Sequence, residues 1–172
     1  MSSFDPVAAT MLASSFFARP TALVARELLG CVLARRVGGV LTAGVIVETE
    51  AYLGADDAGS HAATKGITAR NRVMHGPPGR AYVYLTYGAH HMLNLVTEEE
   101  GAAGAVLVRA IEPVAGLEAM SRRRGGRTGP ELTNGPGKLA AALGIDLTCN
   151  GAPLGGDLAV YAGDHVPDPC VE

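Results

Sequence analysis

Two stretches of this chain each consist of a strand-like run, a glycine turn and a second strand-like run, and this pattern constrains the fold most. In the first, CVLARRV and VLTAGVIVETEAYL flank Gly38 and Gly39. In the second, RAYVYLTYG and HHMLNLVT meet around Gly88. Glycines between apolar runs are typical of tight β-hairpins, whose strands are antiparallel. We therefore expect an antiparallel sheet rather than a doubly wound parallel one.

Helices are expected beside these hairpins. PTALVARELL at 20–29 repeats apolar residues at helical spacing and ends at Gly30. The other expected elements are a buried strand at 104–113 that Pro113 stops, a helix at 114–122, a helix at 135–145 and a last strand at 157–163. A chain of 172 residues fits one domain. The prediction is an α+β fold with one mainly antiparallel sheet and flanking helices.

Composition narrows the class of protein. Charged residues make up 18% of the chain and no run of about 18 apolar residues occurs, so we expect a globular protein without a membrane span. Cys31, Cys149 and Cys170 form neither a CxxC motif nor a Cys/His cluster, and we expect no zinc or other metal. Unpaired cysteines at long spacings fit a reducing compartment, which suggests the cytoplasm.

The charge is uneven along the chain. A net charge of −3 argues against a protein that coats nucleic acid without specificity. Residues 109–127, however, hold five arginines against two glutamates, a local net charge of +3. This segment is either a nucleic-acid contact or a solvated basic loop, and the charge alone favours neither.

The segment VETEAY at 47–52 places unusual residues on one strand face. Because side chains alternate along a strand, Glu48, Glu50 and Tyr52 are expected on one face. The other face is expected to be the core face and to carry Val45, Val47 and Ala51. Two carboxylates beside an aromatic ring either line a cleft or belong to a solvated sheet face.

Tyrosines cluster in the second hairpin. Tyr82 and Tyr84 are neighbours on one strand face, and Tyr87 follows at the strand end beside Gly88. Clustered tyrosines suit stacking on a planar ligand such as a base, although a half-buried sheet also favours tyrosine. The helix start GPGKL offers free amides that could hold a phosphate, but the motif by itself is weak.

Taken together, several separate segments resemble one known family. LVARELLG, IVETEAYLG, RNRVMHGPPGRAYVYLTYG, AVLVRAIEP and GPGKLAAALGI follow the order and approximate spacing of the alkyladenine (3-methyladenine) DNA glycosylases. The resemblance covers roughly residues 16–160. It implies a curved antiparallel sheet, with residues 1–15 as an N-terminal extension and 16–172 as the glycosylase domain.

The resemblance also implies roles for the residues that match the family's motifs. Glu50 matches the general base and Arg109 the arginine that helps hold the attacking water. Other matches concern the DNA: Tyr52 and His61 sandwich the flipped base, Tyr84 forms a third wall, Asn94 crowds the purine 2-amino position, and Tyr87 wedges into the duplex.

The implied activity is that of a monofunctional DNA glycosylase. Such an enzyme flips alkylated or deaminated purines out of double-stranded DNA and hydrolyses the N-glycosidic bond in base excision repair. We expect a monomer that needs no cofactor. The chain has only Lys65 and Lys138, neither on a tyrosine-bearing strand, which disfavours a Schiff-base lyase. Two alternatives remain: a non-catalytic binder of damaged or distorted nucleic acid, and a small-molecule nucleosidase.

The C-terminal part departs from the family pattern. Family members usually continue past the DLAVY-like strand with an Arg-Ile-Gly-Ile-type segment and a Trp-Arg-Phe-like strand, whereas this sequence has no Trp and reads DHVPDPCVE after Gly163. A backbone carbonyl of that segment is a third partner of the catalytic water in the family. We therefore expect a truncated or weakly active version with an uncovered sheet edge.

Overall fold

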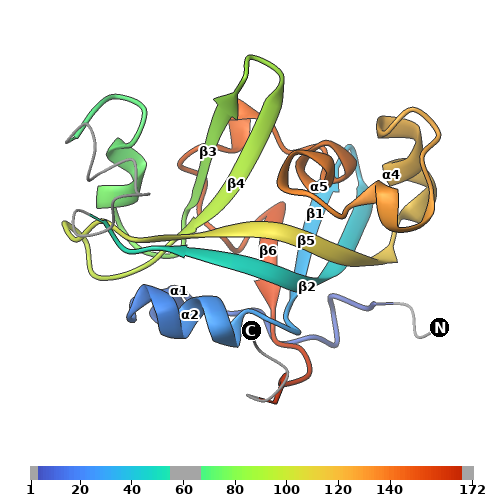
Figure 1. Ribbon diagram of the computed structural model, residues 1–172. Coiled ribbons are helices and arrows are strands. Elements are labelled where there is room, and N and C mark those ends of the chain that lie inside the picture. Colours follow the sequence, from blue (N-terminus) through green and yellow to red (C-terminus); the bar gives the residue numbers. More distant parts are fainter. Residues whose placement is uncertain (1–3, 55–66, 168–172) are drawn as a thin grey trace.

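The computed structural model describes residues 4–54 and 67–167 and contains one curled antiparallel sheet with helices packed against it (Figure 1). The strand order is β3-β4-β5-β2-β1-β6, and each neighbouring pair is antiparallel. The expected fold class is therefore confirmed. The strands are β1 (Val32–Val37), β2 (Val40–Tyr52), β3 (Ala81–Thr86), β4 (His90–Val96), β5 (Ala105–Ala115) and β6 (Leu158–Tyr161).

Helices pack on both sides of the two long strands β2 and β5 (Figure 1). The α-helices within the described residues are α1 (Ser14–Phe17), α2 (Thr21–Glu27), α4 (Leu117–Arg123) and α5 (Pro136–Leu143). Short 3₁₀ turns are η2 (Arg72–His75), η3 (Gly129–Leu132) and η4 (Leu147–Cys149). The helix α2 packs on β2 and α5 on β4 and β5, and both bury apolar side chains in one core. No helix of the described chain is long and apolar enough to cross a membrane.

The hairpin turns agree with the glycine pattern. Gly38 and Gly39 both have positive φ, as the turn between β1 and β2 requires. Gly144, also at positive φ, ends α5, as glycine commonly does at a helix C-terminus. Cys31 and Cys149 are free and buried, so both act as small core residues, while Cys170 lies outside the described residues.

The strand β5 runs past Pro113, where we expected it to stop. Pro113 lies opposite Gly44, directly beside a register shift between Ala43 and Gly44. A bulge interrupts the ladder, so a residue without an N–H is tolerated there. The following helix consequently begins at Leu117, later than predicted, after Gly116 adopts a left-handed conformation.

A second irregularity changes which residues of β2 face the core. Val47 was expected in the core but is 51% exposed. The register between β2 and β5 shifts on both sides of Glu48, which pairs with Ala110. Such an irregularity turns side chains away from strict alternation, so Val47 points outward whereas Ile46 is fully buried.

Both outer strands of the sheet have additional backbone partners. Residues 10–12 hydrogen-bond along β6, where the amide of Leu12 donates to Val160 and that of Ala162 donates to Thr10. Residues 150–153 cover β3 in the same way. The uncovered sheet edge that we expected next to β6 is therefore closed in part by the chain itself.

A substitution at Gly44 tests the β2–β5 contact. A Cβ at this position would lie 2.7 Å from Ile111 Cδ1 and 3.0 Å from the Glu112 carbonyl. We expect Gly44→Ala to lower the free energy of unfolding by about 1–3 kcal/mol, because the packed neighbours must move. The control is Gly156→Ala, whose Cβ would meet nothing within 4 Å. Equal denaturation midpoints for both variants would contradict this account.

Candidate active site

The strand register brings the predicted site residues onto one face of the sheet. Tyr82 lies opposite Asn94, Asn94 opposite Leu107, and Leu107 opposite Glu50, in one row across four strands. Positions two residues along each strand share this face. We call it the site face, and it carries Tyr82, Tyr84, Asn94, Leu107, Arg109, Glu50 and Tyr52.

Arg109 links the two carboxylates of β2. Its Nε donates to Glu48 Oε1 at 2.8 Å and its Nη1 donates to Glu50 Oε2 at 2.6 Å. The hydrogen bond to Glu48 and the charges of both glutamates raise the pKa of Arg109, so the guanidinium stays charged. All three side chains remain partly exposed, which leaves the Glu50 carboxylate accessible to water.

Tyr52 is the second donor to Glu50. Burial and a hydrogen bond to the Glu50 carboxylate raise the pKa of Tyr52 well above its usual range, so the phenol stays protonated and donates. The Glu50 carboxylate thus has a cationic donor from β5 and a neutral donor from its own strand. A carboxylate has about four lone-pair positions, so these two donors from the described residues leave room for a water molecule.

Two tyrosines and an asparagine continue the site face across β3 and β4. Tyr82 is only 1% exposed, and burial raises its pKa to about 12. Its ring centroid lies 5.4 Å from that of Tyr84, which is half-buried. Burial also raises the pKa of Tyr84, and the Glu50 charge adds to this effect. Asn94 is buried and donates from Nδ2 to the Tyr82 carbonyl at 3.4 Å.

Arg70 is a neighbour of this cluster that the sequence interpretation did not single out. Its guanidinium lies 4.8 Å from the centroid of the Tyr84 ring, and its Nη2 donates to the Leu85 carbonyl at 3.2 Å. It therefore supports the outer part of β3 and restricts the Tyr84 ring. Arg70 precedes β3 in an irregular segment, where neither periodicity nor spacing predicts a contact.

Tyr87 occupies the tip of the β3–β4 hairpin, away from the row through Glu50. It is 95% exposed, and its φ of 51° is in the left-handed region. Together with Gly88 at positive φ, it forms the turn closed by the Ala89 amide and the Thr86 carbonyl. A non-glycine residue in this conformation is uncommon and is found preferentially at functional positions.

The structure therefore brings together most of the residues singled out from the sequence. Glu50, Arg109, Tyr52, Tyr84 and Asn94 share the site face, with Tyr87 at the end of its hairpin. His61, the other predicted base contact, lies outside the described residues. Among the described residues no group of His, Cys, Asp and Glu side chains could hold a metal ion.

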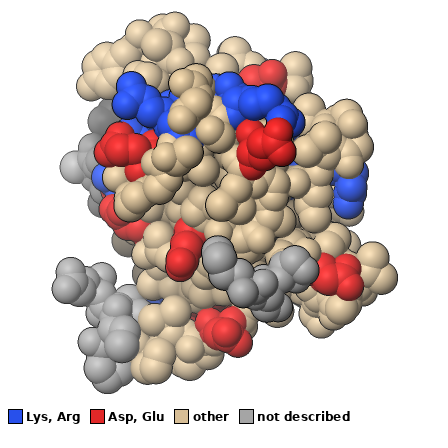
Figure 2. Space-filling view, turned by 90° about the vertical axis from the view of Figure 1, so that its right-hand side faces the viewer, with Lys and Arg blue, Asp and Glu red and all other residues tan. Residues whose placement is uncertain are grey.

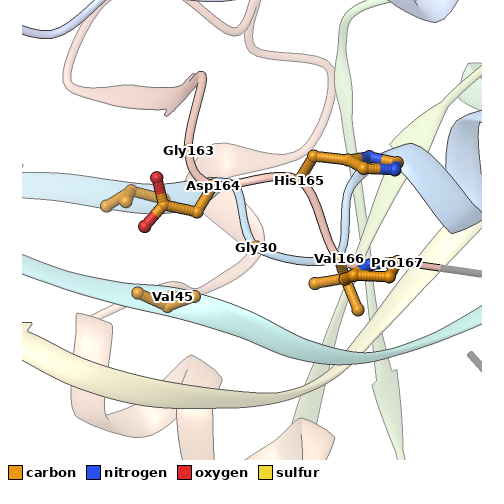
Figure 3. A pocket seen from close by; sticks show the side chains of 8 residues that line it. Gly30, Val45, Gly163, Asp164, His165, Val166 and Pro167 are labelled. Carbon is orange, nitrogen blue, oxygen red and sulfur yellow. The ribbon is translucent and has the colours of Figure 1, made fainter. Parts of the chain in front are cut away.

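A separate cavity lies near the last described residues (Figure 3). It is lined by Gly30, Val32, Val45 and residues 163–167. Its two titratable side chains, Asp164 and His165, point away from one another in Figure 3 and form no acid–base pair. None of its lining residues belongs to the site face.

Comparison with known proteins assigns the family. Residues 15–171 match the family described as methylpurine-DNA glycosylase (MPG). A protein of Chlorobium phaeobacteroides is 52% identical over 147 residues, 85% of this chain and 73% of that protein. A protein of the archaeon Methanoculleus marisnigri is 51% identical over 158 residues, 91% of this chain and 81% of that protein.

A third relative, from Carboxydothermus hydrogenoformans, is 50% identical over 151 residues, 88% of this chain and 78% of that protein. All three carry the name "Putative 3-methyladenine DNA glycosylase". The family match spans most of the chain and both long strands of the site face. This chain therefore belongs to the methylpurine-DNA glycosylase family.

Proposed function

We propose that this chain is a DNA glycosylase that releases alkylated or deaminated purines from double-stranded DNA by hydrolysis, with Glu50 as the base. The observation that carries the proposal is the arrangement of the Glu50 carboxylate between Arg109 and Tyr52, with Tyr84 nearby on the same face. Family membership supports the reaction class, and the names of the relatives suggest 3-methyladenine as one substrate base.

The chemistry requires a water molecule, a base and a good leaving group. The purine leaves with the electron pair of the C1′–N9 bond, and positive charge develops on the sugar. The water oxygen forms a bond to C1′ while its proton passes to Glu50, whose negative charge also stabilises the sugar cation. An alkylated purine already carries positive charge, so it leaves as a neutral base.

The remaining residues of the site face are proposed to bind the base. A target base must first rotate out of the duplex, which costs a few kcal/mol. Stacking on aromatic side chains returns roughly 1–3 kcal/mol per base. Tyr52 and Tyr84 offer such rings beside Glu50, and we assign His61 the same role from the family resemblance. Asn94, held against the Tyr82 backbone, is proposed to contact the purine 2-position.

The first test replaces the proposed base. Glu50→Gln keeps the shape and a hydrogen-bond acceptor for Arg109 but loses the ability to take a proton. We expect excision of hypoxanthine or 3-methyladenine from duplex DNA to fall by roughly 10²-fold or more, with lesion binding retained. The matched control is Glu112→Gln, because Glu112 is an exposed glutamate of β5 that does not belong to the site face. Near-normal excision by Glu50→Gln would remove this residue from the mechanism.

Tyr87 is proposed to fill the space that the flipped nucleotide leaves. Its ring projects from a fixed turn, so it requires little reorganisation on binding. We expect Tyr87→Ser to weaken binding to lesion duplex by roughly 10-fold, since base stacking is worth about 1–3 kcal/mol. Excision from single-stranded DNA should change little, and Tyr87→Phe should retain duplex binding. Equal losses on duplex and single strand would exclude a wedge.

Two arginines of the arginine-rich segment are paired with carboxylates, and two others are held against the backbone. Figure 2 views the side on which α4 lies in Figure 1, and basic side chains form a band across its upper part with acidic side chains directly beside them. Arg109 is held by Glu48 and Glu50, and Arg122 by Glu118. Arg123 and Arg124 donate to backbone carbonyls near α5 and η3.

This charge distribution predicts a modest salt dependence. With about three phosphate contacts, the slope of log K against log salt concentration should be close to −3, at about −0.9 per contact. Fluorescence anisotropy with lesion duplex at several salt concentrations measures it. A slope near −8 would mean that unassigned basic residues contact the DNA backbone.

The same experiments distinguish the proposed function from the two alternative functions. A non-catalytic binder of damaged nucleic acid would release no free base and would tolerate Glu50→Gln. A small-molecule nucleosidase would act on free nucleosides and be indifferent to Tyr87→Ser. The proposed base Glu50 and the proposed wedge Tyr87 lie on one chain, which supports a glycosylase over either alternative. We also propose that the protein acts as a monomer on one lesion.

A further inference from the structure

We propose that Glu48 is a positioning residue that restrains Arg109, so that the guanidinium offers only one nitrogen to Glu50. The inference rests on the proposed role of Glu50 as the base and concerns how that base is kept available. Glu48 does not touch the reacting atoms in this account. It acts through Arg109, to which it is joined by the 2.8 Å contact at Nε.

The contacts of Arg109 carry the inference. Nε is bound by Glu48 and Nη1 by Glu50, so two carboxylates hold two different nitrogens of one planar group. Among the residues that the structure describes, none accepts a hydrogen bond from the third nitrogen, Nη2. Nη2 is therefore available to the attacking water or to the DNA.

Without Glu48, a different arrangement would be favoured. An arginine and a single carboxylate prefer two parallel hydrogen bonds, which use both carboxylate oxygens. Tyr52 already occupies one position on the Glu50 carboxylate. A bidentate Arg109 would add a second donor and leave little room for the water that Glu50 must deprotonate. Glu48 competes for Arg109 and so prevents this arrangement.

The backbone of β2 provides an independent observation. The ladder to β5 is regular from Thr49 to Tyr52 but shifts on both sides of Glu48, and neighbouring Val47 points outward. Continuing the regular register would place Arg109 opposite Glu48, whereas the structure pairs Glu48 with Ala110 and leaves Arg109 without a partner in the ladder. From this position the guanidinium reaches both carboxylates. Exposed ion pairs add little to stability. The contact of Glu48 with Arg109 therefore matters more for holding the guanidinium in place than for the stability of the fold.

The charges around Glu50 give the expected direction of a pH effect. Glu48 and Tyr52 face it from β2, Arg109 from β5 and Tyr84 from β3. Removing Glu48 takes away a like charge and frees the full charge of Arg109 for Glu50. Both changes stabilise the ionised carboxylate, so Glu50 would hold a proton less readily and become a weaker base.

The experiment compares Glu48→Gln and Glu48→Ala with the control Glu112→Gln. Single-turnover excision from a hypoxanthine duplex is measured between pH 4 and 9, and the Glu50 carboxyl carbon is titrated by ¹³C NMR in the free protein. For both Glu48 variants we expect the acid limb and the NMR midpoint to move to lower pH. The plateau rate should fall roughly 10-fold with unchanged lesion affinity, since small misplacement of reacting groups is costly.

Opposing outcomes are equally clear. If the Glu48 variants lose rate without moving the acid limb and the NMR midpoint, Glu48 is only structural and the inference fails. The same holds if they behave like Glu112→Gln. The NMR titration does not depend on activity, so it separates this inference from the proposed function. Normal excision by Glu50→Gln would overturn the function, whereas an unshifted midpoint overturns only the role of Glu48.

Discussion

The pairing of β2 with β5 is the contact on which the rest of the structure depends. It joins the two longest strands, and it brings Arg109 to a carboxylate 59 positions earlier in the sequence. The hairpins extend this pair in both directions, with β4 and β3 on one side and β1 and β6 on the other. Both α2 and α5 pack against the pair, so the core and the site face share one scaffold.

The site face combines a rigid buried part with a polar exposed part. Tyr82, Asn94 and Leu107 are buried and fix the positions of their neighbours. Glu48, Glu50 and Arg109 are exposed enough that their ion pairs contribute little to folding. A polar group held by buried residues is preorganised for chemistry, because little rearrangement is needed when the substrate arrives.

The sequence predicted the fold class and both hairpins, and the family resemblance named most of the residues that the structure places on the site face. Glycine turns and alternation are local properties, and the motifs around Glu50 and Tyr84 are short. Predictions failed where the ladder between distant strands is irregular. Pro113 does not end its strand, and Val47 leaves the core, because a bulge depends on the partner strand and leaves no local pattern.

Contacts between side chains that are distant in the sequence could not be predicted from local sequence patterns either. The register of β2 and β5 lets Glu48 and Glu50 share one arginine. The position of Arg70 over Tyr84 depends on the path of an irregular segment. The family resemblance named several site residues, but it predicted neither the contact of Glu48 with Arg109 nor that of Arg70 with Tyr84. Both contacts require knowledge of which side chains meet, which spacing within one strand cannot supply.

The backbone bonds between residues 10–12 and β6 have a consequence for handling the protein. They occupy the outer hydrogen-bonding groups of the last strand in the sheet. Shortening the N-terminal part to remove them would give β6 a bare row of amides and carbonyls. Two shortened copies would expose the same bare edge, so pairing of β6 with β6 of a second copy would become competitive with the single chain.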